Sequence, residues 1–179
     1  MAQQARQIAS SAMIRTTTPA GPPGYAVLPD QSLRHALMPD AVLLTGRGAI
    51  AAGDLRPDDR VITREHGMAR LSALHQSEMR AGAPMVLVPA HALGRARPGR
   101  DLLLLPDQPV ALRGWRARTL FNAREARVAA LRLADGRIVR EVPAPGGPLV
   151  SIVLDIPSAL YVEGLELVCA STTAVTAGR

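Results

Sequence analysis

The residues of this chain that could carry nucleophilic or acid–base chemistry are few and far apart. The sequence holds one cysteine, Cys169, and four histidines, His35, His66, His75 and His91. A single cysteine forms neither an internal disulfide nor a cysteine-based zinc site, and no two histidines have the spacing of a helical metal-ligand pair. His66 and His75 could hold a metal with a carboxylate, but histidines at turns and strand ends are the simpler interpretation. Cys169 follows apolar residues, which predicts a buried, inert thiol, and we expect no metal site and no cofactor.

Phosphate-binding and hydrolase motifs are not complete either. Gly46-Arg47-Gly48 lacks the third glycine and the following helix of a phosphate-binding loop. Ser10 and Ser11 do not stand in a G-x-S-x-G turn. Asp58 and Asp59 are adjacent, so on an extended chain they point in different directions. They are predicted to shape a turn rather than to form a general acid/base pair.

The charge of the chain is carried on the positive side by arginine alone. The 21 basic residues include no lysine and face 15 acidic ones, which gives a net charge of +6. The arginines are scattered, and aromatic residues make up only 2% of the chain, so few rings are present to stack on exposed bases. A nucleic-acid binder would bind DNA with a steep salt dependence. The pattern favours a solvated surface, and no nucleic-acid partner is expected.

Short apolar runs cut by turn residues predict an all-β fold. The only helical stretch is 115–123. The dipeptide Asp135-Gly136 is typical of hairpin turns and predicts that segments 127–133 and 137–142 pair with each other. The other expected strands are segments of three to six residues that contain apolar runs or alternate apolar with polar residues, and they are 41–45, 60–64, 85–88, 101–105, 110–112, 149–154, 159–162 and 165–169.

The predicted domain occupies 35–173, between a Pro/Gly-rich N-terminal tail at 1–34 and a short C-terminal tail at 174–179. The chain length of 179 residues suits one domain with a tail. No run approaches about 18 apolar residues, so no membrane-spanning helix is expected. No secretory signal is visible at the start. A cytoplasmic location is therefore expected, with signal-less secretion left open.

Several blocks of the sequence, in order, resemble the bacterial Hint domains of the hedgehog/intein family. The resemblance covers roughly 36–171 and implies the Hint fold of many short β-strands. The blocks share their order and their key residue types with that family, and they are Thr45-x-x-Gly48, 54–63, 86–94, 100–106, 117–122, and the pair 153–155 and 161–164.

The resemblance also locates the family's chemistry on this chain. Hint domains cleave or splice themselves through a Cys or Ser at their first residue, which attacks the preceding carbonyl. A His, three residues after a Ser or Thr, protonates the scissile amide. On this sequence the nucleophile position falls at about Ala36, and the Ser/Thr-x-x-His element falls on Leu105 to Gln108. A methyl group cannot attack a carbonyl and a glutamine amide cannot donate a proton at neutral pH, so no catalytic residue is predicted.

The resulting hypothesis is a Hint-like domain without self-cleavage that acts as a structural or protein-interaction module. A protein or peptide segment would dock in the vacated cleft, whose expected residues are Thr45, Asp107, Gln108 and Cys169. The alternative is an active self-cleaving domain that uses a displaced nucleophile, for which Ser32 is the candidate. Ser32 as an ordinary loop hydroxyl is the simpler interpretation, because Gln108 would still supply no proton.

Overall fold

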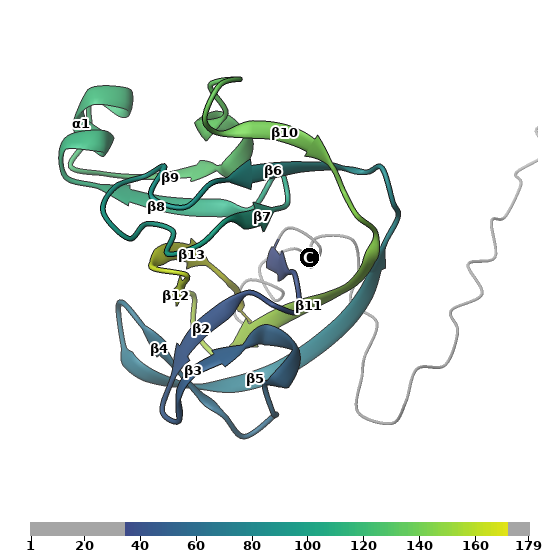
Figure 1. Cartoon of the computed structure of the whole chain (residues 1–179). Helices are drawn as coiled ribbons and strands as arrows, with labels where there is room; N and C mark the ends of the chain where they lie inside the picture. The colour runs from purple at the N-terminus through teal and green to yellow at the C-terminus, as the bar shows by residue number, and fades with distance from the viewer. Residues whose placement is uncertain (1–34, 172–179) are drawn as a thin grey trace, which may run out of the picture.

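The long strand β5 (Gly67–Met79) runs through both halves of the sheet and gives the fold its curl (Figure 1). In the computed structural model, which describes residues 35–171, segment 67–70 pairs with β4 (Arg60–Thr63) and segment 71–79 pairs with β11 (Gly147–Leu154). The register shifts between Val153 and Leu154 of β11. Irregularities of this kind bend a strand and increase its twist, so one continuous strand serves two differently oriented parts of the sheet.

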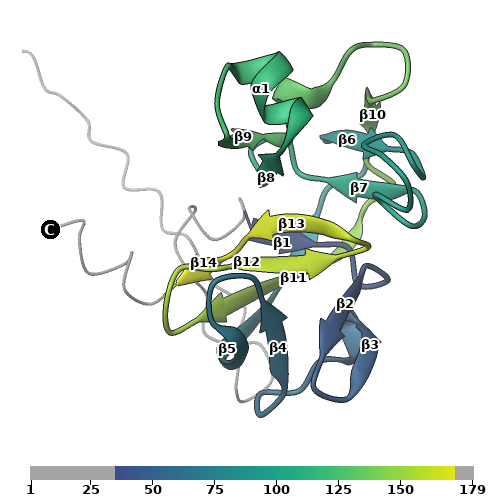
Figure 2. The same cartoon turned by 90° about the vertical axis from the view of Figure 1, so that its left-hand side faces the viewer.

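The sheet of 14 strands follows the order β10-β6-β7-β1-β11-β5-β4-β2-β12-β13-β8-β9, with β3 added beside β2 and β14 beside β11. Its two ends, β9 and β10, lie at the same end of the molecule as helix α1 (Trp115–Phe121) in both views (Figures 1 and 2). The remaining strands are β1 (Ala36–Leu37), β2 (Val42–Thr45), β3 (Gly48–Ala51), β6 (Pro84–Val88), β7 (Leu102–Leu104), β8 (Pro109–Arg113), β9 (Glu125–Ala129), β10 (Arg140–Pro143), β12 (Ala159–Val162), β13 (Leu165–Val168) and β14 (Ala170–Ser171).

Strand β11 is the most deeply buried element of the sheet. Its residues 149–154 are buried without interruption, on both faces, and β5, β1 and β14 all pair with it. A strand covered on both faces reads as a continuous apolar run rather than as an alternating one, as Leu149-Val150-Ser151-Ile152-Val153-Leu154 does. The main core joins Val150 and Ile152 to buried side chains of nearly every other strand.

The expected all-β class is confirmed, and the one expected helix is present. Helix α1 ends at Phe121, two residues before the expected end, because Asn122 adopts the left-handed conformation and donates its backbone N–H to the carbonyls of Ala117 and Arg118. A left-handed residue of this kind commonly terminates a helix. Two short 3-10 helices, η2 (Ala52–Asp54) and η3 (Ala130–Leu133), complete the described elements.

The expected hairpin through Asp135-Gly136 is wrong. Strand β9 pairs with β8 and strand β10 pairs with β6, so the two flanking segments never pair with each other. Asp135 instead accepts hydrogen bonds at its Oδ1 from the backbone N–H groups of Arg137, Ile138 and Val139. These bonds lower the pKa of Asp135 and close a compact loop. The dipeptide therefore makes a local turn between strands that belong to opposite ends of the sheet path.

The two expected tails, 1–34 and 174–179, lie outside the described residues, and so does Ser32. No helix within residues 35–171 is both long and apolar enough to cross a membrane.

The hairpin turn between β12 and β13 is packed closely against the β6–β7 loop (residues 89–101). Both central residues of the turn, Glu163 and Gly164, have positive φ values, of 49° and 80°, which is the pattern of a type I′ turn. A Cβ on Gly164 would stand 2.7 Å from the carbonyl oxygen of Ala96. The Gly99 N–H also donates to the Glu163 carbonyl, at 2.8 Å. The hairpin thus requires glycine both for its conformation and for its contact with the loop.

Substituting Gly164→Ala is expected to lower the free energy of unfolding more than Gly67→Ala does. Both glycines have positive φ, so each substitution costs about 1–2 kcal/mol of backbone strain. A Cβ at Gly67 meets no atom within 4 Å, whereas a Cβ at Gly164 displaces the β6–β7 loop at a further cost of about 1 kcal/mol or more. Chemical denaturation followed by circular dichroism measures the free energy of unfolding of both variants. Equal losses would contradict the close packing of loop and hairpin.

Candidate functional site

Three segments that are far apart in the sequence meet at the backbone carbonyl of Val168, at the end of β13. The Gln108 side chain, from the turn between β7 and β8, donates its Nε2–H to this oxygen at 3.0 Å. The His35 ring, immediately before β1, contacts the same oxygen through Nδ1 at 2.8 Å. Because a carbonyl oxygen can only accept, His35 Nδ1 carries a proton. This junction brings together the two positions at which the sequence places the Hint chemistry.

Ala36, at the expected nucleophile position, is a buried residue of the short strand β1. Its partner across the sheet is Ser151 of β11, and the partner of Ser151 on the other side is His75 of β5. Side chains of directly opposed residues point to the same face, so Ala36, Ser151 and His75 form a row on one face of the sheet. All three are buried, and His75 Nδ1 has no hydrogen-bond partner within residues 35–171.

Sequence reasoning missed this row and the role of His35. Ser151 lies inside an apolar run and His75 inside a strand with small and polar residues, so neither stands out in the sequence. The row exists only through the registers of β1 with β11 and of β11 with β5. The single signal available in the sequence was the position of His35 directly before Ala36.

Gln108 is almost fully buried, with 1% of its surface exposed. Its backbone N–H donates to the Leu105 carbonyl at 3.0 Å, which closes the turn, and its Nε2 also contacts the Pro109 carbonyl at 3.3 Å. Its Oε1 atom has no hydrogen-bond partner in the described part of the chain. Leu105 is half-buried in the same turn, and Asp107 is exposed there. The β7–β8 turn therefore buries the neutral Gln108 amide and exposes the Asp107 carboxylate to solvent.

Cys169 follows Val168 directly and is buried. Its thiol donates to the Ser158 carbonyl at 3.2 Å, and its backbone N–H donates to the same oxygen at 3.0 Å. Burial raises the pKa of the Cys169 thiol to about 12. Since the thiolate is the nucleophilic form of cysteine, this thiol is not reactive at neutral pH.

Thr45 makes its hydrogen bonds in a different turn. Its hydroxyl donates to the Gly48 carbonyl at 2.8 Å and accepts the Arg47 N–H at 3.1 Å, within the β2–β3 hairpin. The Arg47 guanidinium then binds both carboxylate oxygens of Asp59, at 2.7 and 2.6 Å. That bidentate contact lowers the pKa of Asp59. The expected cleft residues thus separate into Asp107, Gln108 and Cys169 around Val168, and Thr45 in a structural turn with Asp59.

The possible metal site of His66, His75 and a carboxylate does not form. Over residues 35–171, no group of three His, Cys, Asp or Glu side chains is placed to hold a metal ion. His66 lies in the exposed turn between β4 and β5, whereas His75 is buried in β5 against β11.

The curled all-β sheet is the fold of a Hint domain. The family model described as "Hint domain" matches residues 35–172, and the chain belongs to this family. No curated protein sequence matches the chain.

One solved structure supports the fold assignment, and a second is similar to a lesser degree. The bacterial intein-like domain from Clostridium thermocellum is similar with a TM-score of 0.54 at 13% identity, over 75% of this chain and 97% of that one. The MchDnaB-1 intein covers 75% of this chain and 99% of its own length at 15% identity, with a TM-score of 0.48. At these identities the likeness concerns the fold alone.

The folded protein is expected to resist thiol labelling at Cys169. A pKa of about 12 leaves almost no thiolate at about pH 8, and the buried sulfur is shielded from reagents. Iodoacetamide followed by intact-mass measurement should show no adduct on the native protein and one adduct after unfolding in denaturant. Rapid labelling of the native chain would contradict the buried, hydrogen-bonded thiol.

The same raised pKa fixes the pH dependence of the Cys169 contribution to stability. Between pH 9 and about 12 the unfolded chain loses the thiol proton while the folded chain keeps it. Stability is therefore unaffected by this group below pH 9 and falls as the pH rises through that window. Cys169→Ala should show a shallower loss of stability there than the wild type.

Proposed function

We propose that this Hint domain has lost self-cleavage and serves as a protein-interaction module. The observation that carries the proposal is the Gln108 amide, buried and donating to the Val168 carbonyl where the family resemblance places the catalytic histidine. An amide supplies no proton at neutral pH, so acid assistance worth about 10²–10⁴-fold in rate is lost. Ala36, across the junction, offers no lone pair for attack.

Other nucleophiles near the junction do not replace the missing one. The Cys169 thiol is protonated at neutral pH. Ser151 lies in the middle of β11, where β1 and β5 flank it on both sides. The amide that precedes Ser151 belongs to the central strand, so an attack there would cut the fold itself rather than release a flanking segment.

The exposed part of the junction supports a binding role. Asp107 projects from the β7–β8 turn, directly before buried Gln108, and is exposed. Loops held by a rigid sheet are the usual place for binding residues. A protein or peptide segment that contacts this turn would meet the Asp107 carboxylate on a turn that the Gln108–Val168 hydrogen bond anchors to the sheet.

The chain, expressed with a removable domain fused before Met1, is expected to stay intact. Its mass should be that of the full fusion, with and without an added thiol, because Ala36 offers no nucleophile and the Gln108 amide protonates no peptide bond. Intact-mass spectrometry after prolonged incubation at neutral pH is the measurement. Cleavage near residue 32 or 36 would overturn the loss of self-processing, and the variant Ser32→Ala would then identify Ser32 as the displaced nucleophile if it abolished the cut.

A partner that binds at the junction is expected not to bind the variant Asp107→Arg and to bind the variant Asp58→Arg as it binds the wild type. Both aspartates are exposed and the same charge reversal is made at each, but Asp58 lies elsewhere and pairs with Arg70. Reversing one contact charge in an interface typically costs about tenfold or more in affinity. The immobilised wild type and both variants are compared for the proteins that they retain from cells that make this chain, by quantitative mass spectrometry. A partner that Asp107→Arg retains in the same amount as the wild type would contradict docking at this turn.

A further inference from the structure

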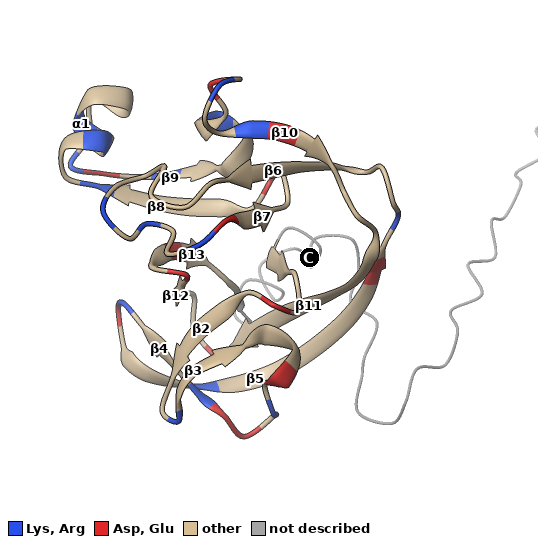
Figure 3. Ribbon diagram, in the orientation of Figure 1, with Lys and Arg blue, Asp and Glu red and all other residues tan. Residues whose placement is uncertain are grey.

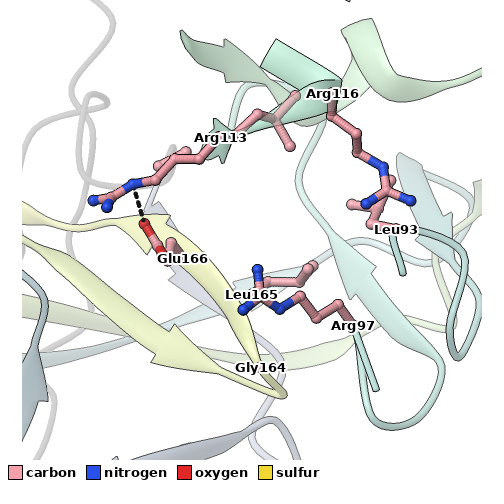
Figure 4. Close-up of a pocket in the computed structure, with 9 residues that line it drawn as sticks. Leu93, Arg97, Arg113, Arg116, Gly164, Leu165 and Glu166 are labelled. Atoms are coloured by element: carbon pink, nitrogen blue, oxygen red, sulfur yellow. Dashed lines mark ion pairs between the residues drawn. The ribbon is translucent and has the colours of Figure 1, made fainter. Parts of the chain in front are cut away.

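A hollow lined by three arginines lies away from the Val168 junction, between the β6–β7 loop, the start of α1 and the β12–β13 hairpin (Figure 4). We call this group of Arg97, Arg113 and Arg116 the arginine pocket. Its cavity volume is about 40 Å³, and it opens to solvent on one side. Figure 4 shows the three guanidinium groups around the hollow, with Glu166 beside Arg113.

The charges next to the pocket form a balanced network that leaves Arg97 and Arg116 out. Arg113 lies 3.3 Å from Glu166 and 3.8 Å from Glu125. The ion pairs that continue from these two carboxylates connect three cations with three anions, which are Arg64, Arg113, Arg127, Glu65, Glu125 and Glu166. The network is therefore neutral. Neither Arg97 nor Arg116 has an ion pair within residues 35–171, although the charge of Arg97 reaches Glu166 and opposes the burial that raises the pKa of that carboxyl. With these two arginines included, five cations face three anions, which leaves an excess of two positive charges at the hollow.

The two unpaired guanidinium groups are close enough to repel each other. Arg116 is half-buried, and burial, followed by the charge of Arg97, lowers its pKa. Buried leucines, Leu93, Leu112 and Leu165, form the apolar lining beneath the arginines, and charge interactions weaken less with distance beside such a surface than in open water. Positive charge gathered beside apolar atoms is unfavourable in the free protein and becomes favourable when an anion enters. Figure 3 shows this concentration of basic residues around α1 and the adjacent loops.

The Arg116 guanidinium and the backbone that carries Arg97 are held in place before any ligand arrives. The Arg116 guanidinium lies 4.5 Å from the centre of the Trp115 ring, and it packs so closely on Gly94 that a Cβ there would stand 3.1 Å from its Nη1. Arg97 is fixed through its backbone, which donates to Gly94 and accepts from Leu93, at 3.1 and 2.8 Å. Preorganised donors lose less entropy on binding, so the arrangement suits recognition rather than a flexible surface.

We infer that the arginine pocket binds a phosphate group. Two uncompensated cations match the charge of about −1.5 to −2 that a phosphate carries at neutral pH, whereas a carboxylate would neutralise only one of them. The planar guanidinium also fits phosphate oxygens in a bidentate manner. The group comes either from free inorganic phosphate or from a small phosphate monoester, because the hollow opens to solvent on one side.

The test is calorimetric titration of the full chain, at constant ionic strength, with inorganic phosphate, O-phosphoserine and acetate. Phosphate and phosphoserine should bind at least about tenfold more tightly than acetate, because acetate pairs with only one of the two cations. Tighter binding of phosphoserine would assign the site to a monoester, and tighter binding of inorganic phosphate would assign it to the free ion.

Variants decide whether the binding uses this pocket. The double variant Arg97→Gln with Arg116→Gln should lose at least about tenfold in phosphate affinity, and Arg116→Lys should lose severalfold because it keeps the charge but not the planar fork. The matched control is Arg80→Gln, which alters an exposed arginine outside the pocket and should change the affinity less than about twofold.

Folding is checked for every variant by circular dichroism and by thermal unfolding with and without phosphate. Phosphate should raise the melting temperature of the wild type and of Arg80→Gln, and leave that of the double variant unchanged. The inference is overturned if the folded double variant binds phosphate as the wild type does, if Arg80→Gln loses as much as the double variant, or if millimolar phosphate does not bind the wild type.

Discussion

One backbone oxygen, the carbonyl of Val168, holds the functional end of this fold together. It receives an N–H from the buried Gln108 amide and another from the His35 ring, so the end of β13, the β7–β8 turn and the start of β1 are tied to one point. The Gln108 amide donates a hydrogen bond to this oxygen but delivers no proton at neutral pH. In the non-cleaving domain that we propose, this structural hydrogen bond stands where the family resemblance places the catalytic histidine. The exposed Asp107 next to it is then positioned by the same contact.

A second constraint is electrostatic and follows from the absence of lysine. Every cation is a guanidinium, and many of these form bidentate or shared contacts with carboxylates, such as Arg47 with Asp59 and Arg64 with Glu125. Such forks carry geometric specificity as well as charge. In the neutral ion-pair network around Glu125 and Glu166, the arginines join neighbouring strands and turns. Arg97 and Arg116 line one hollow and have no ion pair within residues 35–171, and the proposed phosphate would supply the missing negative charge there.

The hairpin and the β6–β7 loop connect these two regions. Val168 and Glu166 belong to the same four-residue strand, β13, and Gly164 in the turn before it touches the loop that carries Arg97. His91 and Ala96 of that loop have positive φ, and the Ala96 N–H donates to His91 Nδ1 at 3.0 Å. Residues held in this sparsely populated region persist when the surroundings fix them. The packing of the hairpin against the loop therefore supports both the junction and the arginine pocket.

The sequence by itself determined the all-β class, the short helix, most strands and the inert environment of Cys169, because apolar periodicity and local composition are short-range signals. The family resemblance placed Ala36 and Gln108 at one site, although the partner Val168 was not visible in it. Only the tertiary structure decided that Asp135-Gly136 makes no hairpin and that β5 spans 13 residues. It also decided that Ala36, Ser151 and His75 share one face of the sheet. Finally, it placed the hydrogen bonds of Thr45 in another turn, and Arg97 and Arg116 at the same hollow. Each of these depends on strand register or on the packing of a loop against a distant turn. Long-range pairing is set by the free energy of the whole sheet, which no local window of sequence contains.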